Sequence, residues 1–348
     1  MSESARLIEV ADDLDAINRL FVERRWGDGL PVVPPTRERV EAMLQGTKRA
    51  RRDIVARVAP AFGAATVEHI AINAVVAGGR PECMPVLIAA VEAVCDPAFN
   101  LQAVQATTNP VAVFLIVNGP MTARLEMNAG MNCLGQGVWS NATLGRALRL
   151  VLQNVGGALP GDMDRATHGQ PGKYTFCCAE NEAESPWMPL HVERGCPSSS
   201  SAVTVVGASG TLNMNMHAKD AEGLIQSMAD SMSFASSNDY WLGGEPWVIV
   251  CPEHAEILHR DGIDKAALRA RLWEDSKMAA GRMATKDLDR TRLSRGAELG
   301  PIDADTMLPV SVRPEEIGIL VAGGPGTHSV YVPSFGDSRA VTRVVDAD

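Results

Sequence analysis

Hydrophobic residues recur along this chain in two patterns, one with helical spacing and one made of unbroken apolar runs. Leu14, Ile17, Leu20 and Phe21 fall on one face of a helix, which predicts an N-terminal helix over about 12–24. Further helical patterns that end at glycine or polar residues predict helices over about 66–79, 84–95, 140–155, 220–233 and 265–279.

The unbroken apolar runs are short, rich in β-branched residues and followed by turn residues. Runs of this kind at 111–117, 247–251 and 317–322 predict strands that are buried on both faces. Two further strands are predicted at 174–179 and 202–206. Strands that alternate with helices predict an α/β fold, with mixed, largely buried sheets flanked by helices in one body or two lobes.

The chain is predicted to have three parts. Residues 1–60 form an N-terminal helix and a proline-rich arm that packs on the body, including a short helix capped by Thr36. Residues 61–245 form the main α/β domain, which carries the candidate site loops. Residues 246–348 form a C-terminal α/β portion with a glycine-rich turn and an extended tail, and its polar stretch at 281–314 is predicted to be a surface excursion.

The composition argues against a nucleic-acid-binding protein and against a membrane-spanning protein. The chain has 42 Asp and Glu against 32 Lys and Arg, and this acidic balance argues against nucleic acid as a partner. It has neither an apolar run long enough to cross a membrane nor a signal-peptide pattern, so no membrane association and a cytoplasmic location are expected. Seven scattered cysteines without a CxxC pair fit reduced thiols. A homo-oligomer is the default expectation for such an enzyme.

The stretch from 128 to 196 contains the densest set of reactive side chains, in turn-rich sequence of the kind that carries active sites. Cys133 lies in a glycine-rich loop just before a predicted helix, where backbone N–H groups can lower the pKa of a thiol and favour a nucleophilic thiolate. A buried packing thiol is the alternative interpretation of this residue. Cys177 and Cys178 are adjacent on a predicted strand, so their side chains point to opposite faces.

The same stretch supplies candidates for proton transfer and anion binding. His168 occupies a turn, and His191 and Glu193 are predicted to share one face of an extended segment, where the carboxylate orients the imidazole. A structural role for His191 is the alternative. Asp164 is a second orienting carboxylate, and the predicted anion-binding cations are Arg165, Lys173 and Arg194. No metal-binding histidine spacing occurs, so no metal ligand is predicted; the cofactor is unknown, and no recognised motif requires one.

A glycine-rich turn follows the predicted strand at 317–322. Gly323, Gly324 and Gly326 let backbone N–H groups approach a ligand, and His328 adds a donor suited to a carboxylate or phosphate. The turn matches neither the Walker A spacing nor the dinucleotide fingerprint, so an ordinary glycine turn is the alternative.

Long segments of the chain resemble a large bacterial family, the UGSC-type (seleno)proteins; they are residues 26–36, 71–94, 164–177, 185–195 and 321–336. The resemblance covers most of the chain and concerns a large domain found fused or adjacent to a small domain with a selenocysteine-or-cysteine Gly-Ser-Cys motif. This chain contains no Cys-Gly-Ser-Cys. The resemblance therefore implies either a separate small thiol or selenol protein as partner, or a member that acts alone.

Three functional hypotheses follow. The leading one is an enzyme that acts on a small polar or carboxylate-bearing molecule by thiol-assisted or acid–base chemistry of the lyase or hydrolase type, with Cys133 as nucleophile. The first alternative is a non-catalytic large subunit that binds a separate thiol or selenol redox protein. The second is a thiol redox protein in which Cys133, Cys177 or Cys178 cycles between free and bonded forms. The enzyme hypothesis requires that turns after separate strands meet in one cleft.

Overall fold

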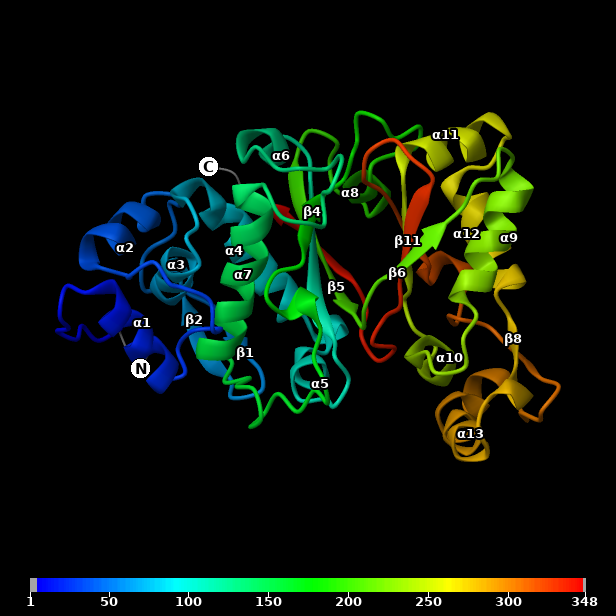
Figure 1. The fold of residues 1–348 in the computed structure, drawn as a ribbon, viewed down its shortest axis with the longest axis horizontal. Helices are drawn as coiled ribbons and strands as arrows, with labels where there is room; N and C mark the ends of the chain where they lie inside the picture. The colour runs from blue at the N-terminus through cyan, green and yellow to red at the C-terminus, as the bar shows by residue number, and fades with distance from the viewer. Residues whose placement is uncertain (1–4, 347–348) are drawn as a thin grey trace.

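Two four-stranded sheets stacked face to face form the centre of the protein. The computed structural model describes residues 5–346. One sheet has the strand order β12-β5-β3-β4, and the other has the order β10-β7-β11-β6. Helices cover the outer face of each sheet, so the molecule has four layers (Figure 1). The predicted α/β class with mixed sheets and flanking helices is confirmed.

The first sheet combines one parallel and two antiparallel pairs. Its strands are β12 (Val341–Val345), β5 (Ser201–Ala208), β3 (Ala112–Asn118) and β4 (Cys177–Ala179). The β3 and β4 strands run parallel, with Ile116 opposite Cys178, so their carboxyl ends lie at the same edge. The β5 strand runs antiparallel to both β3 and β12. The last strand in the chain thus lies in the same sheet as β3.

The second sheet is also mixed. Its strands are β10 (Gly318–Val321), β7 (Trp247–Val250), β11 (His328–Val332) and β6 (Leu212–Asn215). The β10 and β7 strands are parallel, whereas β11 is antiparallel to β7 and β6. Two small antiparallel pairs lie outside these sheets: β1 (Ile54–Val58) with β2 (Gly63–Thr66), and β8 (Met278–Ala279) with β9 (Met307–Leu308).

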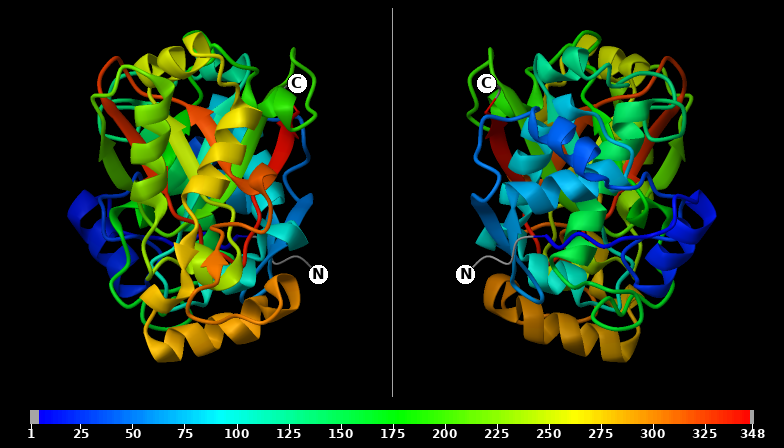
Figure 2. Two further views of the ribbon diagram at one scale, coloured as in Figure 1. Left: turned by 90° about the vertical axis from the view of Figure 1, so that its right-hand side faces the viewer. Right: turned by 90° about the vertical axis from the view of Figure 1, so that its left-hand side faces the viewer.

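The outer helical layers come from different parts of the chain, as the two end views show (Figure 2). The layer beside the first sheet contains α2 (Arg37–Leu44), α3 (Val67–Val76), α4 (Met84–Val94) and α7 (Trp139–Asn154). The layer beside the second sheet contains α9 (Ala221–Met232), α11 (Pro252–Arg260) and α12 (Lys265–Asp275). The other α-helices are α1 (Leu14–Glu23), α5 (Leu101–Gln105), α6 (Met121–Arg124), α8 (Leu190–Glu193), α10 (Asn238–Leu242) and α13 (Thr285–Leu299).

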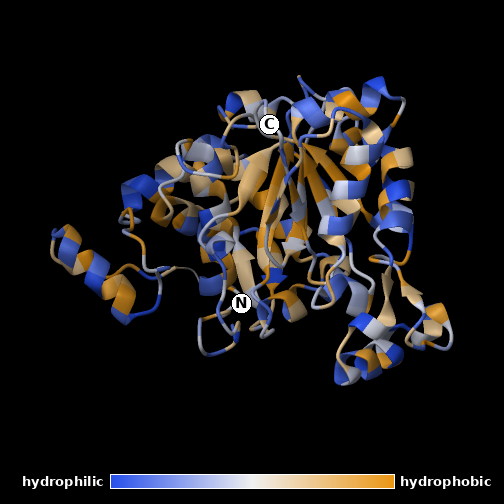
Figure 3. Cartoon of the chain, turned by 45° about the vertical axis from the view of Figure 1, so that its right-hand side comes forward, coloured by the Kyte–Doolittle hydropathy of each residue, from blue (hydrophilic) through white to orange (hydrophobic). Residues whose placement is uncertain are grey.

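Strand alternation divides the hydrophobic core into three clusters. In β3, Leu115 and Val117 face the helices, while Phe114 and Ile116 face the second sheet. Trp247 of β7 meets the latter pair in the cluster between the sheets. The central strands β3, β7 and β10 are accordingly strongly hydrophobic, and the strands in the middle of the molecule are mainly orange in Figure 3. Burial on both faces explains why their sequences are unbroken apolar runs rather than alternating ones.

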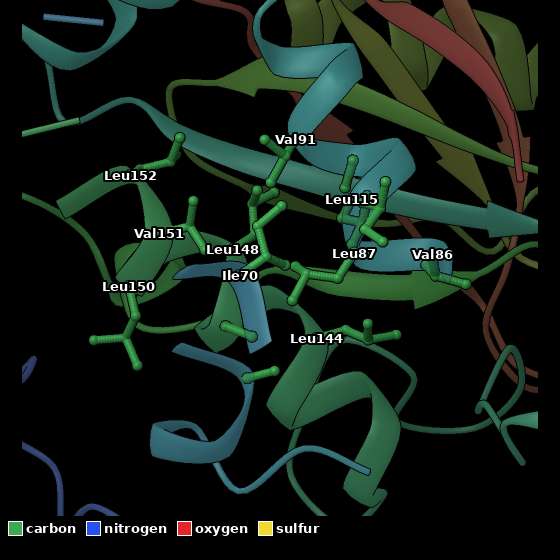
Figure 4. Packing of buried hydrophobic residues seen from close by; sticks show 14 of the residues in the cluster. Ile70, Val86, Leu87, Val91, Leu115, Leu144, Leu148, Leu150, Val151 and Leu152 are labelled. Carbon is green, nitrogen blue, oxygen red and sulfur yellow. The ribbon is translucent and has the colours of Figure 1, made fainter. Parts of the chain in front are cut away.

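The helix-side core of the first sheet joins residues from three helices and a central strand. Ile70 of α3, Leu87 of α4 and Leu148 of α7 pack with Leu115 of β3 (Figure 4). Each of these four side chains is fully or almost fully buried. This packing fixes α7 against the sheet, and the loop that precedes α7 carries Cys133.

Most predicted elements are present, and two local predictions, for 281–314 and 190–193, are wrong. The predicted helices correspond to α1, α3, α4, α7, α9 and α12, and Thr36 caps α2 by accepting a hydrogen bond from the Arg39 N–H at 3.4 Å. The stretch 281–314, predicted as an irregular excursion, contains the helix α13. Residues 190–193, predicted as extended, form the helix α8. The predicted extended tail pairs with β5 as β12.

Two further features bear on the sequence predictions. The proline-rich arm and α1 pack on the body, because Phe21 and Val32 belong to the core beside the first sheet. Within residues 5–346, no helix combines the length and the apolar character that crossing a membrane requires.

Candidate active site

Cys133 lies in the loop between α6 and α7, and one side chain of α7 holds this loop in place. The Asn141 carboxamide oxygen accepts a hydrogen bond from the Asn128 N–H at 2.9 Å. Its nitrogen donates to the carbonyl oxygens of Asn128 at 2.8 Å and Cys133 at 3.1 Å. Asn141 is buried, so its polar atoms satisfy the loop backbone in place of water. The residues around Cys133 are otherwise largely exposed.

The sulfur of Cys133 is surrounded by hydrogen-bond donors. Cys178 of β4 belongs to the same buried cluster as Cys133, and its thiol is the main reason that the pKa of Cys133 lies below its ordinary value. Burial opposes the shift, while the backbone N–H groups of Cys133, Leu134 and Gly323 favour it. The interaction between the two thiols, together with burial, raises the pKa of Cys178 well above its ordinary value. The pair therefore favours a thiolate on Cys133 and a thiol on Cys178.

These donors correct one part of the sequence argument. The predicted source of N–H groups was the helix after the loop, but α7 begins only at Trp139. The donors instead come from the loop itself and from Gly323, which follows β10. Cys133 is buried, and it also lines a pocket.

A pocket that is open to solvent lies beside Cys133. Its lining residues come from the loop, from β7 and from both sides of the glycine turn: Asn132, Cys133, Leu134, Gly135, Ile249, Ala322, Gly323, His328 and Val330. The lining includes apolar side chains as well as Asn132, His328 and the backbone of the glycine turn. His328 is exposed and its Nδ1 lies 3.1–3.2 Å from the carboxamide of Asn213. The pocket therefore offers one thiolate and one imidazole to a small ligand.

The glycine turn after β10 contacts the Cys133 loop directly. The Gly323 N–H donates to the Ala129 carbonyl oxygen at 2.8 Å. A Cβ atom on Gly324 would lie 2.9 Å from the Cβ atom of Met131, closer than side chains tolerate. Gly324 is therefore needed for the two loops to pack together. Gly326 lies slightly apart, where its carbonyl oxygen accepts a hydrogen bond from the Cys251 thiol at 3.1 Å.

Asp164 and Lys173 lie away from the Cys133 pocket, in a group with residues of α7 and β3. The Asp164 carboxylate is buried and contacts Lys173 at 2.7 Å and Arg149 of α7 at 3.1 Å. Burial lowers the pKa values of both cations. These residues line a second, much smaller cavity, which shares no residue with the Cys133 pocket. Asp164 thus does not orient an imidazole, and Lys173 is occupied by an internal ion pair.

His191 and Glu193 do not share one face, because they lie on the short helix α8. The His191 ring is 1% exposed, and its Nδ1 lies 3.9 Å from Glu182 Oε1. Glu193 instead pairs with Arg269 and with Lys265 of α12. Burial raises its pKa, but these two cations outweigh burial and lower it. His191 and Glu193 therefore do not form the predicted carboxylate–imidazole pair.

The remaining predicted site residues also lie outside the pocket. His168 and Arg165 are exposed in the turn before β4. Arg194 pairs with Glu245 at 2.8 Å, and its guanidinium lies 5.3 Å from the ring centre of Trp247. The structure thus brings together Cys133, the glycine turn and His328, and it separates them from the other predicted residues.

The sequence argument missed a buried polar cluster at the carboxyl ends of β3 and β4. Glu180 follows β4 directly and accepts hydrogen bonds from Asn118 at 2.5 Å and from the Leu190 N–H at 2.7 Å. Its other oxygen lies 3.7 Å from Lys265, and burial raises its pKa. The parallel pairing of two strands that end in polar residues is the signal that could have found this cluster.

Neither a metal-binding cluster of side chains nor a match to known proteins indicates the function. Among residues 5–346, no cluster of three or more His, Cys, Asp or Glu side chains is arranged to hold a metal ion. Comparison with known protein families yields no matching family model, and comparison with curated proteins yields no match.

Proposed function

We propose that this chain is an enzyme in which Cys133 acts as a nucleophile on a small polar or carboxylate-bearing molecule bound in the Cys133 pocket. The observation that carries the proposal is the position of Cys133, which lines the pocket while the Cys178 thiol and nearby backbone N–H groups lower its pKa. A nucleophilic cysteine needs this combination of thiolate stabilisation and access. We further propose a cytoplasmic location, where the thiols stay reduced.

The residues of the pocket support a two-step role. The Cys133 thiolate attacks an electrophilic carbon of the ligand, the bond from that carbon to the leaving group breaks, and the leaving group takes a proton from the His328 imidazole. Water then attacks the same carbon and gives a proton to His328, which releases the product and the Cys133 thiolate. A reaction of the lyase or hydrolase type fits this pair of groups. Arg165, Lys173 and Arg194 lie elsewhere, so a ligand carboxylate would be bound by Asn132, His328 and the amides of the glycine turn.

A second candidate function is supported by the surface around the pocket. Met131 and Leu134 are large hydrophobic residues of the Cys133 loop, and they are 71% and 37% exposed. Exposed hydrophobic residues beside a reactive group favour a protein partner. A separate small thiol or selenol protein would approach Cys133 over this rim, as the family resemblance implies.

Two alkylating reagents of different charge test the substrate class. Iodoacetate carries a carboxylate and iodoacetamide is neutral, and both react with thiolates. If the pocket binds carboxylates, the iodoacetate-to-iodoacetamide rate ratio is higher at Cys133 than at Cys196, which lies outside the pocket and serves as internal reference. Equal ratios at the two residues would contradict carboxylate binding. A Cys133→Ser variant that keeps full turnover once a substrate is identified would end the assignment of the nucleophile.

A further inference from the structure

Cys178, the second thiol, lies in a more buried environment than Cys133. Cys178 lies in the middle layer between the two sheets and is completely buried, with Ile116 as its neighbour on β3. Its sequence neighbour Cys177 points to the opposite face, into the helix-side core. All seven cysteines are free thiols, and Cys178 is the one whose thiol lowers the pKa of Cys133.

We propose that Cys133 and Cys178 form a two-thiol redox centre that reduces a small disulfide bound in the pocket and thereby becomes a Cys133–Cys178 disulfide. This inference rests on the proposed function, because the same Cys133 thiolate makes the first attack. It adds a resolving thiol, an oxidant class and a second reaction that a lone nucleophile does not perform.

The two positions suit different steps. Cys133 lines the pocket, where a small molecule reaches it, whereas Cys178 is fully buried in the same cluster and does not line the pocket. The Cys133 loop contains the exposed residues Met131 and Leu134, and Gly135 follows. Loops of this composition move more easily than the strands they connect. The loop can therefore carry the Cys133 sulfur onto Cys178, which stays fixed in its sheet.

The reaction balances without any further component. The Cys133 thiolate attacks one sulfur of a disulfide RSSR, the S–S bond breaks, and RS⁻ leaves and takes a proton from water. Cys178 then loses its proton and attacks the Cys133 sulfur, which releases the second RS⁻. Two electrons pass from the protein thiols to RSSR, and the products are two RSH molecules and the protein disulfide.

The first step also prepares the second. In the resting pair, the pKa of Cys178 is raised first of all by its contact with Cys133, with burial as the next cause. A mixed disulfide on Cys133 carries no charge, so the contact no longer holds the proton on Cys178. The resolving thiol thus becomes easier to ionise only after the ligand sulfur has bound to Cys133, which orders the two steps.

The experiment uses the reduced full-length protein, oxidised glutathione as the disulfide and mass spectrometry of the intact chain and its peptides. The wild type is expected to release two glutathione molecules per chain and to yield a peptide linked through Cys133 and Cys178. The Cys178→Ser variant is expected to release one glutathione and to keep the other on Cys133. Cys178→Ala serves as a second variant in case serine impairs folding, and Cys177→Ser, buried on the other face, is expected to behave as wild type.

The outcomes separate this inference from the proposed function. A wild type that keeps a stable glutathione adduct on Cys133, with no linked peptide, would overturn the redox centre while leaving Cys133 a nucleophile. A wild type in which Cys133 reacts with neither oxidised glutathione nor iodoacetamide would overturn both. A linked peptide that survives in Cys177→Ser and disappears in both Cys178 variants supports the pair.

Discussion

The Cys178 thiol lies in the same buried cluster as Cys133; Cys178 belongs to a buried strand, whereas Cys133 belongs to a loop that lines a pocket. The two thiols come from segments that are distant in the chain. Their interaction gives them opposite tendencies to ionise, because the proton stays on the fully buried sulfur. The reactivity of Cys133 therefore depends on a neighbour that a ligand never touches.

The first prediction concerns the Cys178 thiol. Cys178→Ala removes the thiol that lowers the pKa of Cys133, so this pKa should rise and alkylation of Cys133 should require a higher pH. The measurement is the pH dependence of the iodoacetamide rate at Cys133, with the midpoint expected below 9.0 in the wild type, the ordinary value for a cysteine thiol. Cys177→Ala is the matched control, since its side chain lies in the helix-side core. An unchanged midpoint in Cys178→Ala would refute the role of the Cys178 thiol.

A second prediction concerns the side chain that holds the loop. Asn141→Ala removes three hydrogen bonds to the backbone of the Cys133 loop and should lower the free energy of unfolding by about 2 kcal/mol. It should also raise the pKa of Cys133, because the loop N–H groups lose their alignment. Gln153→Ala is the control: Gln153 also lies on α7 but binds the carbonyl oxygens of Arg25 and Gly27. Equal Cys133 alkylation profiles in both variants would contradict the prediction.

A third prediction separates the Asp164 ion pairs from the Cys133 site. Asp164→Ala leaves Lys173 and Arg149 without their shared carboxylate, which should lower the free energy of unfolding by about 3 kcal/mol. Because the two pockets share no residue, the alkylation rate of Cys133 at neutral pH should stay at its wild-type value. Urea unfolding and alkylation of the same samples provide both readings. A stable variant with slow Cys133 alkylation would show that the two places are coupled.

A fourth prediction concerns the pH dependence of folding. Burial raises the pKa of Asp239 to about 6, against an ordinary value of 3.8, although Ser334 and Tyr331 donate hydrogen bonds that oppose the shift. The folded state thus binds this proton more tightly than the unfolded chain. The stabilisation by this group is complete below about pH 4 and is lost as the pH rises to about 6, amounting to about 3 kcal/mol.

The check is urea unfolding across that range for the wild type and Asp239→Asn, which has no proton to lose. The stability difference between the two proteins should shift in favour of the variant as the pH rises. A difference that stays constant with pH would contradict the assignment of a raised pKa to Asp239.

The fold was predictable where hydrophobic burial produces a regular pattern. The buried run of β3 and the helical spacing of α7 are local properties, and both elements are where the sequence places them. The helix α13 escaped prediction because the face it buries includes Thr291 and Arg295 at helical spacing. The Arg295 guanidinium donates hydrogen bonds to the carbonyl oxygens of Tyr240 and Pro309. These residues are distant from the helix pattern, so the local sequence does not predict the contacts.

The site was predictable only in part, for a similar reason. Strand alternation correctly placed Cys177 and Cys178 on opposite faces. Which of the two meets Cys133 depends on the register of β4 against β3 and on the loop held by Asn141, and both are tertiary features. His191 was misplaced because a four-residue helix has too few positions to show a period.

The most direct test of the central claim is residue-resolved alkylation of the native protein at neutral pH with limiting iodoacetamide. Cys196 and Cys95 are partly exposed, but burial raises the pKa of each, to about 11 for Cys95. The account predicts that Cys133 is modified first, ahead of these more exposed thiols, because it is the thiol held as a thiolate beside a pocket. Modification of Cys196 or Cys95 before Cys133 would contradict it.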